Sequence, residues 1–229
     1  MAVRPVFFSE PCGEWLVRTR MIDFKWHPGM SMVQRQKSVT SLHTALRNIY
    51  PHVSVLEVSR MSDEGLGEQL SAFNLSFLPH GRSKRVTVEC AFQASKVFER
   101  GGPYEDLLDA RSNDAKRDPR LTESGRLIGL RYFGEAWPLM PLTAFYDWLY
   151  INALHQHPDL TKNLMIYEAF TDIAFNPEKS INCQAAAVAL YVSLSKTGKI
   201  DDVLTSNKHF LAMEENAYLR EASGQGSLF

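Results

Sequence analysis

The sequence predicts an α+β fold, a predominantly helical single domain with small antiparallel β elements. Apolar residues recur at helical intervals over several long stretches, whereas the runs rich in Val, Ile, Phe and Trp are short and lie between turn signals. Strands and helices do not alternate as in a doubly wound fold. The 229 residues, of which 45% are hydrophobic, suit one hydrophobic core. We therefore expect one domain over residues 1–229.

The first third of the chain predicts strands around one long helix. Residues 3–9 and 15–26 are rich in β-formers, and the turn Pro11-Cys12-Gly13 between them indicates a hairpin. Apolar positions at helical spacing predict a helix over 31–50, which Pro51 ends. Shorter elements are expected as a strand at 53–59, a helix at 65–72 and a second hairpin formed by 74–78 and 85–88.

From residue 89 the spacing of apolar residues becomes helical. It predicts a helix over 89–100, which Gly101-Gly102-Pro103 ends. A weak alternation over 127–133 indicates a strand. Further helices are expected at 104–110, 113–118, 143–155, 160–167, 180–194 and 206–222.

Composition and charge exclude several classes of protein. No apolar run approaches the roughly 20 residues of a membrane span, and three cysteines without a leader sequence indicate a soluble, cytoplasmic protein. The net charge is −1, and residues 81–131 hold eleven Lys and Arg against eight Asp and Glu. This surplus suits a diphosphate or a short single strand better than a DNA duplex. No metal or cofactor motif is present, and His155-Gln156-His157 lacks further ligands.

Three polar side chains share one face of the helix predicted over 89–100. At about 100° per residue, Glu89, Gln93 and Lys96 fall within roughly 60° of one another. Glu89 and Lys96 lie about 10 Å apart along such a helix, which is too far for an adjacent ion pair. The face is either an ordinary solvated surface or a place where an acid, an amide and an amine converge on a ligand.

The segment Glu89-Cys90-Ala91-Phe92-Gln93-Ala94-Ser95-Lys96 resembles the E-x-x-F-Q-x-x-K motif of the NADAR superfamily, also called YbiA-like. Leu70-Ser71-Ala72-Phe73-Asn74 resembles the F-S-N-F element that precedes it, with Ala72 where the family has Asn. Residues 169–172 and 179–184 resemble the family's later acidic step and helix start. Within residues 1–69, the segments 24–29, 34–37 and 56–59 resemble the antitoxin branch that accompanies DarT-type toxins. Residues 1–69 would then be an extension on a core of 70–222, with 223–229 as a flexible tail.

The resemblance implies N-glycosidase chemistry. In the toxin-linked branch the substrate is ADP-ribose attached to guanine in single-stranded DNA, so the expected protein is an ADP-ribosyl-guanine glycohydrolase that acts as enzymatic antitoxin to a DarT-type toxin. Two alternatives remain. One is an N-glycosidase for riboflavin-pathway intermediates, which the long N-terminal addition disfavours. The other is a non-catalytic antitoxin that binds ADP-ribose or the toxin, which has no need of an acid and a nucleophile.

Cleavage of a bond between ribose C1 and nitrogen requires a proton for the leaving group and stabilisation of an oxocarbenium-like centre. Glu89 and Asp172 are the predicted carboxyl pair. Alternatively, a neutral lysine captures C1 as a Schiff base after the ribose ring opens, which requires a depressed amine pKa. Lys96 is the candidate, with Lys25 and Lys179 in reserve. A charged Lys96 would instead hold phosphate or orient Glu89.

The remaining candidates would bind substrate, although each also has an ordinary structural interpretation. Gln93 and Asn182 suit ribose hydroxyls, and Ser71 suits a phosphate. Stacking on the guanine and adenine rings is expected from Phe73, Tyr132 and Trp148, of which Trp148 lies in a strongly apolar run typical of a core. The diphosphate or the DNA backbone would contact Arg111, Lys116 and Arg126.

The C-terminal residues Gln225-Gly226-Ser227-Leu228-Phe229 resemble the Q-L-[SD]-L-F peptide with which bacterial replication proteins bind the sliding clamp. Gly226 departs from the motif, which prefers Leu. A flexible tail ending in two apolar residues has the form of such an anchor. Clamp binding that is lost on the double substitution Leu228→Ala, Phe229→Ala would support it over an accidental resemblance.

Overall fold

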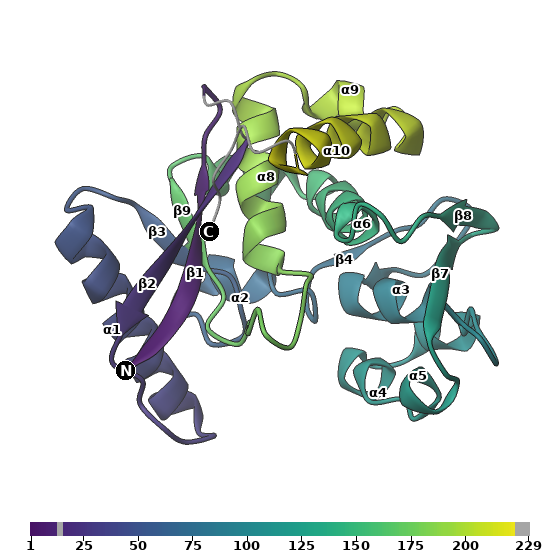
Figure 1. Cartoon of the computed structure of the whole chain (residues 1–229), viewed down its shortest axis with the longest axis horizontal. Helices are drawn as coiled ribbons and strands as arrows, with labels where there is room; N and C mark the ends of the chain where they lie inside the picture. The colour runs from purple at the N-terminus through teal and green to yellow at the C-terminus, as the bar shows by residue number, and fades with distance from the viewer. Residues whose placement is uncertain (13–15, 223–229) are drawn as a thin grey trace.

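The computed structural model describes residues 1–12 and 16–222, with side chains as far as residue 214 (Figure 1). The strands are β1 (Ala2–Ser9), β2 (Val17–Phe24), β3 (Val55–Glu57), β4 (Ser76–Phe77), β5 (Val86–Thr87), β6 (Lys96–Phe98), β7 (Leu127–Tyr132), β8 (Glu135–Trp137) and β9 (Ala169–Thr171). The helices are α1 (Met32–Ile49), α2 (Gly65–Gln69), α3 (Val88–Ala94), the 3-10 helix η1 (Glu105–Asp109), α4 (Ser112–Lys116), α5 (Arg120–Glu123), α6 (Ala144–His155), α7 (Pro158–Leu164), α8 (Gln184–Lys196), α9 (Ile200–Leu204) and α10 (Asn207–Ala222).

The largest sheet joins the two halves of the chain. Its strand order is β2-β1-β9-β3. Strands β1 and β2 pair antiparallel over their full lengths, while β9 pairs antiparallel with β1 and parallel with β3. Asp172 directly follows β9. The sheet therefore fixes the position of one predicted catalytic residue.

Side chains alternate across β1, and each face of the sheet packs into its own core. Val6 and Phe8 pack in one cluster with Leu42 and Leu46 of α1. Phe7 lies in a larger cluster that also contains the apolar side chains of α6 and α8. Accordingly, α1 and α8 lie on opposite sides of β1 and β2 (Figure 1).

The middle of the chain forms a group of short elements around α3. This helix packs against η1, α4 and α6. Strands β6, β7 and β8 form an antiparallel sheet beside it, and β4 and β5 form a two-stranded hairpin (Figure 1). Because α3 begins immediately after β5, its first turn, with Glu89, is anchored to this hairpin.

The α+β class is confirmed, with helices and small antiparallel sheets, although the largest sheet also contains the parallel pair β3 and β9. The two hairpins, the long helix over 32–49 and the helices over 144–155 and 184–196 agree with prediction. Strands β8 and β9 were not predicted. Both have only three residues, which is too short for an alternating pattern to be recognised.

The helix predicted over 89–100 is wrong in its second half. Helix α3 ends at Ala94, and Lys96–Phe98 form strand β6, paired with β7. Ser95 closes the helix by donating its hydroxyl to Ala91 O over 2.8 Å. Val97 and Phe98 are residue types that favour strands, and pairing with β7 satisfies their backbone groups. Glu89 and Lys96 therefore do not share a helix face.

Among the residues that the structure describes, no helix is long and apolar enough to cross a membrane. The clamp-like tail, with Gln225, Leu228 and Phe229, lies outside the described residues.

Candidate functional site

Glu89 is a buried carboxyl in the first turn of α3, with an exposed fraction of 5%. Thr87 caps this helix, since its hydroxyl accepts the N–H of Cys90 over 3.2 Å. Gln93, one turn further on, donates its amide to Glu89 Oε1 over 2.8 Å, and Lys116 Nζ lies 3.7 Å from the same oxygen. The carboxyl therefore has both a hydrogen-bond donor and a compensating cation, as a buried charge requires.

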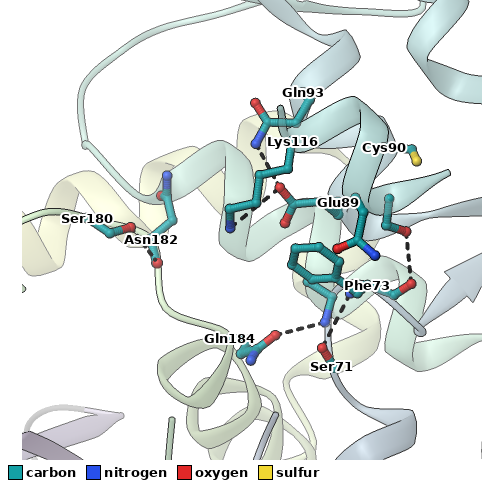
Figure 2. Close-up of polar contacts among 12 residues, drawn as sticks. Ser71, Phe73, Glu89, Cys90, Gln93, Lys116, Ser180, Asn182 and Gln184 are labelled. Atoms are coloured by element: carbon teal, nitrogen blue, oxygen red, sulfur yellow. Dashed lines mark hydrogen bonds and ion pairs between the residues drawn. The ribbon is translucent and has the colours of Figure 1, made fainter. Parts of the chain in front are cut away.

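Phe73 and Lys116 lie next to the Glu89 carboxyl (Figure 2). Lys116, at the end of α4, has a side chain that is 55% exposed, and its ammonium lies 5.0 Å from the centroid of the Phe73 ring. The guanidinium of Arg60 lies 4.3 Å from the same ring. An aromatic ring flanked by two cations suits a ligand that combines a base with phosphates.

Lys96 reaches the same region from β6 rather than from α3. Its ammonium lies 4.7 Å from the centroid of the Phe92 ring. Burial lowers the pKa of Lys96, the charge of Glu89 opposes this shift, and Lys116 adds to it. Lys96 is therefore within electrostatic reach of Glu89 and Lys116, although it forms no ion pair with Glu89. The predicted helical geometry is wrong, and the meeting of acid and amine over a substrate stays a prediction.

Asp172 follows β9 and is buried, with an exposed fraction of 8%. Its Oδ1 accepts the backbone N–H groups of Ala174 and Phe175 over 3.0 and 3.2 Å. Burial raises the pKa of Asp172 to about 6, although these N–H groups, the Gln184 side chain and the charge of Lys116 lower it. A carboxyl in this range can both hold and release a proton near neutral pH.

The backbone of Ala72 connects the two carboxyls. Its carbonyl accepts the N–H of Glu89 over 2.9 Å, and its own N–H donates to Gln184 Oε1 over 2.8 Å (Figure 2). The Gln184 side chain also lowers the pKa of Asp172. The start of α3, the segment before it and the start of α8 are thus held in fixed relation.

Two amide oxygens at the site have no hydrogen-bond partner among the described residues. They are the side-chain oxygens of Gln93 and Asn182, and both are buried. Asn182 lies on the segment that leads into α8, where its carbonyl accepts the Ser180 hydroxyl (Figure 2). Buried polar atoms in native proteins are nearly always paired. These two oxygens thus lack a partner that a ligand with hydroxyl or amide donors would supply.

The other predicted aromatic residues lie in a cluster between α6 and the β7–β8 hairpin. Trp148 packs against Trp137 with ring centroids 4.8 Å apart and against Tyr132 at 6.0 Å. Burial raises the pKa of Tyr132. These contacts give both residues a role in packing, while the Trp148 indole N–H has no partner among the described residues. Ser71 is also buried, and its hydroxyl accepts the Phe73 N–H at 3.5 Å, within a turn.

The predicted cations do not gather in one place. Arg126 forms an ion pair with Glu99 at 2.7 Å, and its side chain is 86% exposed. Arg111 precedes α4 and is exposed. The reserve lysines Lys25 and Lys179 are exposed as well. Of the predicted cations, Lys116 is thus the one in contact with Glu89.

Tyr146, in the apolar run of α6, is not among the residues predicted from the sequence. The side chain is buried, and its ring packs edge-on against Phe92 with centroids 5.1 Å apart. Burial raises the pKa of Tyr146, and the charges of Glu89 and Asp172 both raise it further. The phenol therefore lies within electrostatic reach of both carboxyls. No pattern in the sequence distinguishes it from a packing tyrosine.

The described residues contain no group of three or more His, Cys, Asp or Glu side chains placed to hold a metal ion. A surface pocket of about 380 Å³ lies elsewhere, lined mainly by residues 74–76 and 156–160. The chemistry that the site offers is acid, base and amine chemistry. It comes from two buried carboxyls, one amine of lowered pKa and two unpaired amide oxygens.

Comparison with known proteins identifies the family of the chain. A search of curated proteins gives no match. The family model of the DarT1-associated NADAR antitoxins matches residues 2–224, nearly the whole chain. The chain therefore belongs to the family of DarT1-associated NADAR antitoxins, and its role is that of an antitoxin.

Proposed function

We propose that the protein is an N-glycosidase that removes ADP-ribose from guanine bases of single-stranded DNA, and so reverses the product of a DarT1-type toxin. The observation that carries the proposal is the buried carboxyl of Glu89 with Lys116 beside it, and the electrostatic reach of Lys116 to two further buried groups, Lys96 and Asp172, on separate elements. A protein that only binds ADP-ribose or the toxin has no need of a buried acid and an amine of lowered pKa.

In the overall reaction the bond between ribose C1 and the guanine nitrogen breaks. The nitrogen gains a proton, and the oxygen of a water molecule ends on C1 of free ADP-ribose. Asp172 is suited to give the proton to the leaving nitrogen, because its pKa of about 6 keeps part of the population protonated near neutral pH. Glu89 is suited to stabilise positive charge at C1, because its buried carboxyl lies beside Lys116, whose side chain reaches the surface.

Lys96 supports a second course through a covalent intermediate. Opening of the ribose ring moves the C1–O bond pair to the ring oxygen, which takes a proton, and C1 becomes an imine. The neutral Lys96 amine adds to C1, the guanine nitrogen leaves with a proton, and water then hydrolyses the lysine imine. Burial lowers the pKa of Lys96 and so increases the neutral fraction that this course requires.

Substrate recognition is assigned to groups around these three residues. Phe73 with Arg60 and Lys116 offers a stacking surface and charge for a base and the diphosphate. The unpaired oxygens of Gln93 and Asn182 accept from ribose hydroxyls. Trp148 and Tyr132, further along the aromatic cluster, extend the surface on which bases could stack.

Turnover tests the proposal most simply. The protein is incubated with a molar excess of an oligonucleotide that carries ADP-ribosylated guanine, and loss of the adduct is followed. We expect many equivalents of free ADP-ribose per protein and an unmodified oligonucleotide.

Adduct loss limited to one equivalent, or tight binding without release, would instead support a binding antitoxin. Hydrolysis of a riboflavin-pathway intermediate, with the oligonucleotide left intact, would support the small-metabolite alternative.

A further inference from the structure

A second buried acid lies behind Asp172. Glu57, the last residue of β3, has an exposed fraction of 1% and forms no ion pair with any described residue. Its Oε1 accepts the Ser59 hydroxyl over 2.5 Å and the Ile173 N–H over 2.9 Å, and its Oε2 lies 2.7 Å from the Thr171 hydroxyl. A carboxyl that is fully buried without a cation requires an explanation.

Glu57 hydrogen-bonds the residues immediately before and after Asp172. Glu57 lies opposite Thr171 in the parallel pairing of β3 with β9. It therefore contacts the residue before Asp172 through a side chain and the residue after it through the backbone. These two hydrogen bonds fix the direction in which the chain leaves β9, and with it the direction of the Asp172 side chain.

The hydrogen bonds that run from Glu57 through Thr171 to His43 accommodate either protonation state of Glu57. His43 Nε2 lies 2.8 Å from the Thr171 hydroxyl, and burial lowers the pKa of His43 to about 4, so that the imidazole is neutral near pH 7. A neutral imidazole nitrogen either donates or accepts. When Glu57 is ionised, His43 donates to Thr171 and Thr171 donates to Glu57. When Glu57 is protonated, both directions reverse.

The groups around Glu57 and Asp172 favour one negative charge on these two carboxyls rather than two. Burial raises the pKa of Glu57 to about 8, and the charge of Asp172 raises it further. Lys116 is the cation that acts on Asp172. The other groups within electrostatic reach of Asp172 are Tyr146, Tyr150 and Cys183, which burial keeps neutral. Those that act on His43 are Arg47 and Asp63. Asp172 is therefore the more acidic of the two, and it carries the charge when the pair has lost one proton, while Glu57 keeps its own.

We propose that Glu57 is a positioning residue for the glycosidase site: in its protonated form it holds the segment that carries Asp172 without placing a second negative charge beside it. This inference rests on the proposed function. Loss of the Glu57 proton would add that charge behind Asp172. Asp172 would then become anionic less readily when it gives its proton to the leaving nitrogen, and turnover would fall. The site would then have an alkaline limit set by a residue that does not touch the substrate.

Glu57→Gln is the decisive variant, because glutamine mimics the protonated acid. Its oxygen accepts from Ser59 and Ile173, and its amide donates to Thr171, which then donates to His43. We expect kcat at pH 6.5 within about threefold of wild type, and loss of the alkaline decline centred near pH 8. Glu57→Ala should lower kcat by about tenfold or more with a smaller change in KM, because Thr171 and Ile173 lose their partner.

Two further variants separate positioning from general destabilisation. Thr171→Val breaks the link to His43 but keeps the bond to Ile173, and should lower kcat even if Glu57→Ala does not fold. Ser193→Ala is the control, because Ser193 is equally buried and bonds Leu16 O, far from β3 in the chain. Its kcat and pH profile should match wild type.

A titration without substrate keeps this inference independent of the proposed activity. Carbon-13 NMR of labelled glutamate should show one carboxyl with a midpoint near pH 8, which is absent in Glu57→Gln and moves to lower pH in Asp172→Asn. An ordinary midpoint for Glu57, or an alkaline limb that persists in Glu57→Gln, would overturn the inference. If the carboxyl midpoint near pH 8 is observed but neither wild type nor any variant hydrolyses the oligonucleotide, the proposed function fails instead.

Discussion

Glu89 and Asp172 are both buried carboxyls of one site, yet their surroundings differ. Glu89 has a cation, Lys116, at 3.7 Å and an amide donor from Gln93. Among the described residues, Asp172 accepts two backbone N–H groups and has no ion pair, and its charge raises the pKa of a second buried acid, Glu57. The difference indicates different tasks. A compensated carboxyl can stabilise developing positive charge, while a carboxyl of raised pKa can deliver a proton.

The largest expected effect comes from removing the charge at each position in turn. Glu89→Gln and Asp172→Asn should each lower kcat on ADP-ribosylated oligonucleotide by about a hundredfold or more. The residual activities should differ in their pH dependence. A limb near pH 6 should persist in Glu89→Gln and be absent in Asp172→Asn, because Asp172 is the group whose pKa burial raises.

The control for this pair is Asp159→Asn, an exposed acid at the start of α7. Identical pH profiles for the Glu89 and Asp172 variants would show that the two carboxyls do not divide the work.

Removing the cation should have a smaller effect. Lys116→Met takes away the partner of Glu89 and one of the cations beside Phe73. We expect kcat/KM to fall by about tenfold to a hundredfold, with part of the loss in KM, because the ammonium would contact both the acid and the diphosphate.

Arg117→Met is the matched control, since Arg117 is an exposed cation next to Lys116 at the end of α4. An equal loss in both variants would point to general electrostatic attraction of DNA rather than to a contact at the site.

A smaller loss is expected from the unpaired amide. Asn182→Ala removes a buried oxygen that has no partner among the described residues. If this oxygen accepts a ribose hydroxyl, KM should rise by about tenfold, corresponding to one hydrogen bond. Asn163→Ala, at an exposed position of α7, should leave KM unchanged. Unaltered KM in Asn182→Ala would remove this residue from the binding site.

The smallest effect concerns stability. A carboxyl whose pKa is raised on folding stabilises the protein fully below its unfolded pKa, and this contribution is lost as pH rises to the folded value. Glu57 has an ordinary value of 4.5 and a folded value of about 8. The free energy of unfolding should therefore fall more steeply from pH 5 to pH 8 in wild type than in Glu57→Gln, by about 1 kcal/mol or more. Urea titrations across this range measure the difference, and parallel slopes would contradict it.

Much of the architecture could be predicted from local patterns. The hairpin over β1 and β2 and helix α1 carry strong turn signals and regular apolar spacing, and both are present. The predicted extension of helix α3 to Arg100 was wrong, because pairing of Val97 and Phe98 with β7, some 30 residues later, outweighs the local helical pattern. Such long-range pairing leaves no mark in the spacing of neighbouring residues.

Of the site, the sequence predicts the contacts between near neighbours but not those between distant segments. Glu89 and Gln93 lie one helical turn apart, so their contact could be inferred from spacing. The approach of Lys116 to Glu89 and the contacts of Glu57 depend on how distant segments pack. The aromatic cluster around Trp148 gives that residue a packing role, and its stacking on a base stays a prediction.

Capture of the intermediate tests the central claim most directly, that Lys96 meets the anomeric carbon beside Glu89. The protein is mixed with ADP-ribosylated oligonucleotide in the presence of borohydride, which reduces a lysine imine to a stable amine, and the labelled peptide is identified by mass spectrometry. We predict one ADP-ribose adduct on Lys96, absent in Lys96→Met, which should also lose turnover. No adduct together with full activity of Lys96→Met would contradict the account.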